Sequence, residues 1–286
     1  MVACGGTPQP TTIAATNTTA TATVIPSPEP ISEQSSSMST SGYNALYIGH
    51  SFGEPFAERL EDYAKNSEID GHTQGIVFRG GKKGGNPQGL WNDEGARIEI
   101  QEILDSGDID LLIMICGYDA ETGWAIPKWI DYALSKNPDT KFGLACAWPD
   151  LPQDYPSAAE FANGWHTVYE EIWHPIIHRL KKDYPETEIL DIPHGLAALE
   201  LRSQFEAGTL DDVNAMVSND GNAIFRDTKG HADQILEVLG TLVWLGSIYD
   251  VDLSVYPVGH LGNEIAQYRV DLRGIAEAIV DEERNW

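Results

Sequence analysis

The stretch NALYIGHSFGEPFAERL, residues 44–60, decides the fold that we expect for this chain. Its apolar run ends in Gly-His-Ser-Phe-Gly at residues 49–53, and a helical pattern begins almost at once. A short, wholly apolar run followed directly by a helix is typical of a buried parallel strand. Ser51, between two glycines at the strand end, is therefore either a helix N-cap or a nucleophile.

Further apolar runs alternate with amphipathic stretches along the rest of the chain. Strands separated by helices predict a mostly parallel sheet that is covered on both faces. We therefore expect an α/β fold, a three-layer α/β/α domain with a five-stranded, flavodoxin-like sheet. The predicted strands are 45–48, 73–78, 111–116, 142–147 and 188–192, and the predicted helical stretches are 55–67, 95–107, 154–185 and 231–251.

Residues 1–42 differ in composition from residues 43–286, which form the predicted domain. They are rich in Thr, Ser, Pro and Ala with few large apolar side chains, so we expect a disordered tether. The opening MVACGG is similar to the cleavage and lipidation site of bacterial lipoproteins, with Cys4 as the acylated residue. This similarity implies an extracytoplasmic, membrane-anchored lipoprotein at the cell surface or in the periplasm.

The net charge of −26, from 44 acidic and 18 basic side chains, excludes some classes of partner. Such a chain is repelled by nucleic acid and by anionic lipid surfaces, so we expect membrane contact only through a lipid anchor.

Cys116 and Cys146 lie in apolar runs, where we expect buried thiols. A disulfide between them stays open if their strands are neighbours.

Residues 49–53 match G-x-S-x-G, the nucleophile elbow of α/β-hydrolases. In that fold several strands precede the nucleophile, and one of their loops supplies an oxyanion donor. Ser51 instead follows the first strand of the predicted domain. An α/β-hydrolase-type esterase that uses the same serine therefore stays an alternative.

Four motifs in order resemble the blocks of the SGNH (GDSL-like) hydrolases. They are IGHSFGEPF at 48–56, VFRGGKKGGNP at 77–87, LLIMICGYDAE at 111–121 and FRDTKGHADQILEVLGTLVWL at 225–245. The resemblance implies Ser51 as nucleophile, His231 as general base and Asp227 as the acid that orients it. It also implies an oxyanion hole from the backbone N–H groups of Ser51 and Gly81, and Asn86 is the nearest residue by sequence that can replace the asparagine which the family has at position 119.

Two positions depart from that family pattern. The usual Asp-x-x-His spacing is one residue longer in Asp227-Thr-Lys-Gly-His231, where Gly230 allows a tight turn and Asp220 is the alternative acid. Asp119 stands where the family has an asparagine, and an ionised carboxylate cannot donate to an oxyanion.

The resemblance implies a serine esterase that hydrolyses short acyl esters without cofactor or metal. Trp91 and Trp148 follow strands and, with Asp119, are the predicted substrate-binding residues, which suggests carbohydrate esters. A non-catalytic carbohydrate-binding lipoprotein on a degenerate hydrolase fold is the other alternative.

We interpret one four-residue periodicity as a solvated helix face rather than a zinc site, because such steps drift about 40° each around a helix. Its members are His166, Glu170, His174 and His178.

Overall fold

A computed structural model describes residues 41–80, 82–117, 120–257 and 262–284. The chain divides into two units, Met1–Met38 and Ser39–Trp286, and every described residue belongs to the second. The predicted lipidation site Cys4 and most of the predicted tether lie outside the described residues, as do Gly81 and Asp119.

The second unit is built on a five-stranded sheet in the order β2-β1-β3-β4-β5, with every neighbouring pair parallel. Its strands are β1 (Asn44–Gly49), β2 (Thr73–Phe78), β3 (Leu111–Cys116), β4 (Lys141–Cys146) and β5 (Ile189–Ile192). The three-layer α/β/α fold and the positions of all five predicted strands are confirmed. Strand β3 is buried at every residue, which explains why its sequence is apolar without alternation.

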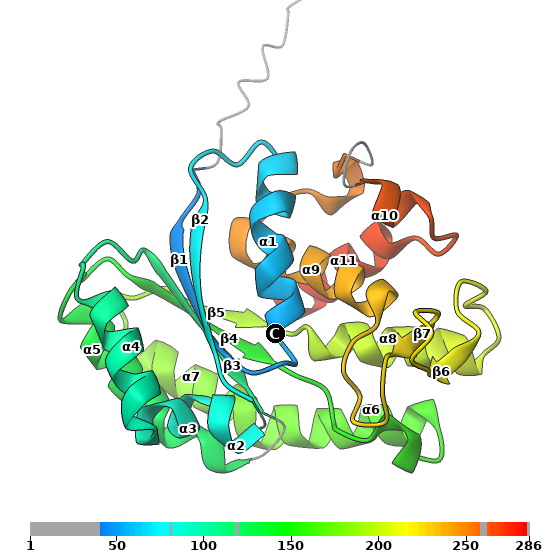
Figure 1. Cartoon of the computed structure of the whole chain (residues 1–286), viewed down its shortest axis with the longest axis horizontal. Coiled ribbons are helices and arrows are strands. Elements are labelled where there is room, and N and C mark those ends of the chain that lie inside the picture. The colour runs from blue at the N-terminus through cyan, green and yellow to red at the C-terminus, as the bar shows by residue number, and fades with distance from the viewer. Residues whose placement is uncertain (1–40, 81, 118–119, 258–261, 285–286) are drawn as a thin grey trace, which may run out of the picture. The chain divides into compact units, whose positions relative to one another are not determined.

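Helices cover both faces of the sheet (Figure 1). Helices α1 and α9 pack together on one face, while α4, α5 and α7 lie on the other. The α-helices are α1 (Glu54–Asn66), α2 (Lys82–Gly85), α3 (Pro87–Asn92), α4 (Glu94–Leu104), α5 (Ile126–Leu134), α6 (Ala158–Val168), α7 (His174–Asp183), α8 (Gly195–Glu206), α9 (Gln234–Tyr249), α10 (Gly262–Ala266) and α11 (Leu272–Arg284). A π-helical turn at Tyr169–Trp173 joins α6 to α7.

A second, two-stranded parallel sheet precedes α9. It consists of β6 (Ala215–Val217) and β7 (Ala223–Phe225), and Phe225 also bridges to Ala232 in the antiparallel sense. Sequence patterns did not predict these three-residue strands, because so short a run carries no clear periodicity. They matter for the site because they fix both ends of the segment between them and α9.

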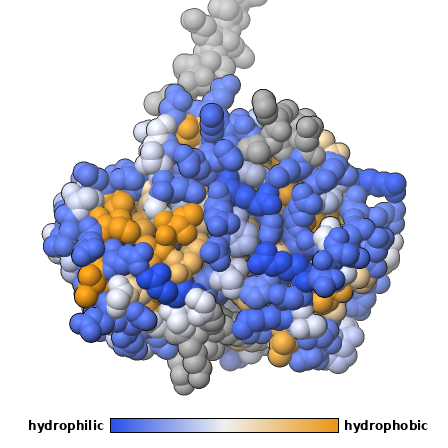
Figure 2. All heavy atoms as spheres, viewed as in Figure 1, coloured by the Kyte–Doolittle hydropathy of each residue, from blue (hydrophilic) through white to orange (hydrophobic). Residues whose placement is uncertain are grey.

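The cysteines Cys116 and Cys146 pair in the register of β3 and β4, and both are buried free thiols, as predicted. Most of the face seen in Figure 2 is hydrophilic, in keeping with the net charge of −26. Apolar side chains gather on the side where edge strand β2 and helix α4 lie. The exposed apolar residues there include Ile76 and Ile98. No helix among the described residues is long and apolar enough to cross a bilayer.

Candidate active site

Ser51 lies in the turn that connects the carboxyl end of β1 to α1. Backbone N–H groups of Gly53 and Glu54 donate to the carbonyl of His50, which closes this turn at 3.0 and 3.2 Å. The N-cap of α1 is Gly53, without a side-chain cap, so the N-cap alternative for Ser51 is wrong. The serine hydroxyl instead faces a segment that lies 180 residues later in the chain.

Asp227 and His231 lie in a tight turn that is closed at its base. Next to the Phe225–Ala232 bridge, the Arg226 N–H donates to the His231 carbonyl at 2.9 Å. The Oδ1 atom of Asp227 accepts the backbone N–H groups of Gly230 and His231 at 3.1 and 3.2 Å. The carboxylate therefore holds its own turn as well as facing the imidazole. Gly230 has φ +94°, a left-handed conformation that favours glycine.

These two segments bring serine, histidine and aspartate into one hydrogen-bonded chain. Ser51 Oγ lies 2.8 Å from His231 Nε2, and His231 Nδ1 lies 2.6 Å from Asp227 Oδ2. The His231 side chain is 18% exposed and that of Asp227 is 44% exposed. Burial by itself raises the pKa of Asp227, but the hydrogen bonds from His231 and Gly230 outweigh it and lower the pKa. The ionised carboxylate thus fixes Nδ1–H as donor and leaves Nε2 to accept the serine proton.

The segment after β4 supports this turn from one side. The indole N–H of Trp148 donates to the Gly230 carbonyl at 2.9 Å, and the Leu151 N–H donates to the Lys229 carbonyl at 3.1 Å. Leu151 has φ +55°, a costly conformation that the surrounding contacts must impose. The buried Arg202 holds the same segment through bonds to the carbonyls of Pro152 and Tyr155 at 2.5 and 2.6 Å, which makes the support rigid.

Trp148 is fully buried, so its predicted role in contacting substrate is wrong. Its ring packs on Phe52, which in turn lies 5.2 Å from the His231 ring. Trp148 does follow a strand, but the side chain turns into the core because its only polar atom finds a backbone carbonyl there. Trp148 therefore acts beneath the site, through the turn that carries His231.

Trp91 is half-buried in α3, where it packs edge-on against Trp129 with ring centres 4.7 Å apart. The Lys128 ammonium lies 5.4 Å from its ring centre and 5.7 Å from that of Trp124, which is 48% exposed. A substrate contact of Trp91 stays a prediction. Trp124 is the exposed aromatic side chain of this group, and sequence reasoning did not single it out.

Asn86 lies beside the Ser51 turn, which joins β1 to α1 at residues 50–53. A Cβ on the preceding Gly85 would overlap the Gly49 carbonyl oxygen and stand 2.5 Å from His50 Cβ, so the two segments are in van der Waals contact. Asn86 is buried, and its Oδ1 caps α3 by accepting the Gly89 N–H at 2.8 Å. Its amide NH₂ group is the part of the side chain that can donate to an oxyanion.

A layer of aromatic rings that sequence reasoning missed lies under the Ser51 turn. His194 is fully buried, with its ring 5.1 Å from that of Phe56 and 5.7 Å from that of Trp148. The only signal in the sequence was its place just after β5, among the residues that follow strands. The described residues hold no group of three or more His, Cys, Asp or Glu side chains suited to a metal ion.

Two solved structures are similar to this chain. A DUF4886 family protein from Bacteroides uniformis matches with a TM-score of 0.55 at 15% identity, over 84% of this chain and 95% of that one. The periplasmic domain of a lipopolysaccharide acetyltransferase from Salmonella ser. Paratyphi A matches with a TM-score of 0.33 at 12% identity, over 55% and 68%. No protein-family model and no curated protein matches the chain. The first likeness shows a shared fold, and the five-stranded parallel sheet is compatible with an SGNH-like domain.

Proposed function

We propose that this protein is a serine hydrolase of the SGNH type that cleaves short acyl esters through an acyl-Ser51 intermediate. The observation that carries the proposal is the chain from Ser51 Oγ through His231 to Asp227, with contacts of 2.8 and 2.6 Å. Two elements far apart in sequence supply these groups, at the carboxyl edge of the sheet where α/β folds bind ligands. A structural serine needs neither the imidazole nor the carboxylate behind it.

The geometry supports a two-step acyl transfer. His231 Nε2 takes the proton of Ser51 as Oγ attacks the ester carbonyl, and then gives it to the leaving alcohol oxygen. Water repeats the sequence on the acyl-enzyme, which releases the carboxylic acid and restores the serine. Asp227 stabilises the imidazolium in both steps and stays ionised, in keeping with its lowered pKa.

An oxyanion hole is the second requirement of this mechanism. We propose the backbone N–H of Ser51 and the amide group of Asn86 as donors, with Gly81 as a third donor outside the described residues. Support comes from the contact between the Asn86 segment and the Ser51 turn, and from the cap bond that holds its amide. One such donor contributes roughly 3 to 4 kcal/mol to transition-state stabilisation in studied enzymes.

We propose acetylated or otherwise acylated carbohydrate as the substrate class, with the protein held outside the cytoplasm by a lipid on Cys4. The exposed Trp124 and its neighbour Trp91 support a sugar-binding surface, since aromatic faces stack on sugar rings. The lipoprotein-like start and the Thr/Ser/Pro-rich stretch before the domain support the location.

The test is hydrolysis of p-nitrophenyl acetate and butyrate by the full chain, beside Ser51→Ala and His231→Ala. We expect both variants to lose roughly 10³-fold or more of kcat/KM, because nucleophile and base act as one unit. Ser203→Ala, on the exposed side of α8, and His166→Ala, on α6, are the matched controls and should keep full activity.

Covalent labelling separates this mechanism from the alternatives. A fluorophosphonate should label the unmutated protein and the Ser203→Ala control on Ser51, and leave Ser51→Ala unlabelled. Ester hydrolysis that survives in Ser51→Ala would refute the serine mechanism. A protein that neither labels nor turns over, yet binds glycans equally well after Ser51→Ala, would instead be the non-catalytic carbohydrate-binding protein.

A further inference from the structure

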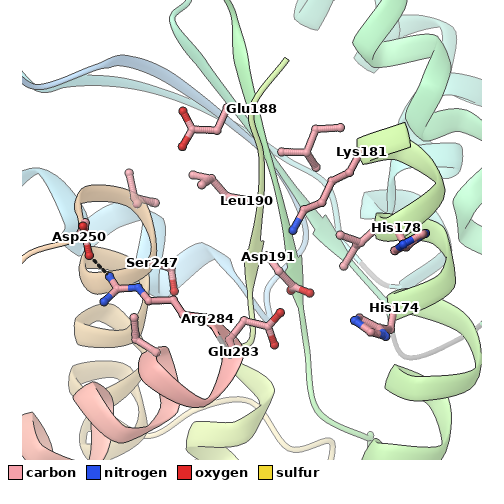
Figure 3. Close-up of a pocket in the computed structure, with 14 residues that line it drawn as sticks. His174, His178, Lys181, Glu188, Leu190, Asp191, Ser247, Asp250, Glu283 and Arg284 are labelled. Atoms are coloured by element: carbon pink, nitrogen blue, oxygen red, sulfur yellow. Dashed lines mark ion pairs between the residues drawn. The ribbon is translucent and has the colours of Figure 1, made fainter. Parts of the chain in front are cut away.

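A cavity of about 590 Å³ lies away from the triad, along the open edge of β5 (Figure 3). Helix α7 forms one wall, and the carboxyl-terminal ends of α9 and α11 form the other. His231 stands just before the other end of α9, and a helix of 16 residues is about 24 Å long. The cavity is therefore a separate place in the fold, and ligand binding there does not depend on the proposed esterase activity.

Two carboxyl groups, Asp191 and Glu283, line the base of this cavity, and the buried phenol of Tyr169, which is not part of the lining, contacts both. The Tyr169 hydroxyl contacts Oδ2 of Asp191 and, at 2.7 Å, Oε2 of Glu283. A hydroxyl has one hydrogen, so with both carboxylates ionised the three groups lack one donor. Asp191 is only 8% exposed, and its Oδ1 has no hydrogen-bond partner among the described residues. In Figure 3 the Asp191 and Glu283 carboxyl groups lie next to each other within the cavity.

The charges around these carboxyl groups are uneven. Burial, and then the neighbouring Glu283 carboxylate, raise the pKa of Asp191, so a nearby cation would relieve the site. The basic side chain of Arg284 is already paired with Asp250 at the rim. Lys181 has no carboxylate of the described residues within ion-pair distance, and it reaches from α7 toward Asp191. The cavity thus offers acceptors at its base, and on its wall a cation that no described carboxylate pairs with.

The remaining lining limits the shape of a ligand. Aliphatic side chains line the space between the polar groups, and they come from Ile177, Ile189, Leu190, Ile248 and Val280. A simple anion would face two carboxyl groups, and the described residues offer no group suited to hold a metal ion. A ligand that satisfies base, wall and lining together carries a primary ammonium, a carboxylate and an aliphatic part.

We propose that this cavity binds a free aliphatic α-amino acid. The ligand ammonium donates to the carboxyl groups of Asp191 and Glu283, its carboxylate lies against the Lys181 ammonium, and its side chain packs on the aliphatic lining. Three N–H donors supply the hydrogen that the Tyr169 group lacks.

Isothermal titration of the full chain with L-leucine tests this, with n-butylamine and pentanoate as probes that carry one half of the ligand each. We expect leucine to bind at least tenfold more tightly than either half. Lys181→Gln should lower the affinity for leucine at least tenfold and leave the affinity for n-butylamine unchanged. The matched variant Lys182→Gln, on the same helix, should change neither affinity.

Asp191→Asn should lower the affinity for both leucine and n-butylamine, and Ser51→Ala should alter neither. Because Asp191 is buried and this variant can fail to fold, Lys181→Gln carries the test independently. Absence of leucine binding at millimolar concentration in the unmutated protein overturns the proposal, and the carboxyl pair then only shares a proton. Equal affinity for leucine and n-butylamine also overturns it, because Lys181 then plays no part.

Discussion

Protonation of His194, in the aromatic layer below the Ser51 turn, should limit stability in acid. His194 is fully buried, and neither ring nitrogen has a hydrogen-bond partner among the described residues. The backbone carbonyls of Ile192 and Phe52 lie near the ring without reaching hydrogen-bond geometry. Burial first, and the neighbouring His50 second, lower the pKa of His194 to about 3.

The size of the effect can be worked out from this pKa. Below the ordinary pKa of 6.5 the unfolded chain takes up a proton on the ring, whereas the folded chain stays neutral down to about 3. The stability from this group is thus complete above the unfolded pKa and is lost as the pH falls through the window. The slope is about 1.4 kcal/mol per pH unit, so a fall from about pH 6.5 to about pH 5 removes about 2 kcal/mol of unfolding free energy.

Urea unfolding of the unmutated protein, His194→Leu and His194→Phe between about pH 7.5 and pH 5 measures this slope. Both variants should be at least as stable as the unmutated protein near neutral pH, because an apolar ring or chain replaces nitrogens that make no hydrogen bond with the described residues. Between about pH 6.5 and pH 5, the unfolding free energy of both variants should fall less steeply with pH, by about 1.4 kcal/mol per pH unit, because one proton fewer is bound on unfolding. Parallel curves for His194→Leu and the unmutated protein would show that this ring does not titrate as argued.

Three further changes probe the site. Trp148→Phe keeps an aromatic ring but removes the N–H that the Gly230 carbonyl accepts, so the unfolding free energy should fall by about 1 to 3 kcal/mol. With p-nitrophenyl acetate as substrate, kcat should fall by a larger factor than KM changes. An unchanged kcat would count against a positioning role for Trp148. Asp227→Asn should lower kcat/KM by about 10²- to 10⁴-fold, with little change in the urea midpoint of unfolding near neutral pH. A fully active variant would mean that groups other than Asp227 orient His231. Gly85→Ala should lower the urea midpoint, because the added methyl group would overlap the carbonyl oxygen of Gly49 at the end of β1. An unchanged midpoint would show that the segment around Gly85 shifts freely.

The sequence predicted the fold well because burial on both faces leaves a direct trace in it. Strands such as Leu111–Cys116 are apolar throughout, and their order alone indicates a parallel sheet. The position of Ser51 after the first strand could also be predicted, since a strand end is marked by glycine. In contrast, helix α8 at Gly195–Glu206 was not predicted, because almost its whole first turn is apolar and its periodicity is weak.

Side-chain direction was the part that sequence could not supply. Trp148 follows a strand as a cleft residue would, yet it turns inward because the carbonyl of Gly230 accepts its N–H. The partnership of Tyr169, Asp191 and Glu283 joins residues up to 114 positions apart, and no local pattern connects them. Such contacts depend on tertiary packing, which periodicity and motif spacing do not encode.

The Asp227-to-His231 spacing, one residue longer than in the SGNH pattern that the sequence resembles, is accommodated by the turn and is compatible with the proposed site. The extra residue must fit without moving either end of the turn, and Gly230 allows this by adopting a left-handed conformation. A side chain at this position would bring its Cβ to 2.8 Å from Pro152 Cδ. Both ends are then fixed, by the Phe225–Ala232 bridge and by Asp227 Oδ1. Because the same carboxylate also bonds to the imidazole at 2.6 Å, the group that sets the turn is the group that orients the His231 ring. Asp220, the alternative acid, is therefore not needed to explain the orientation of the ring.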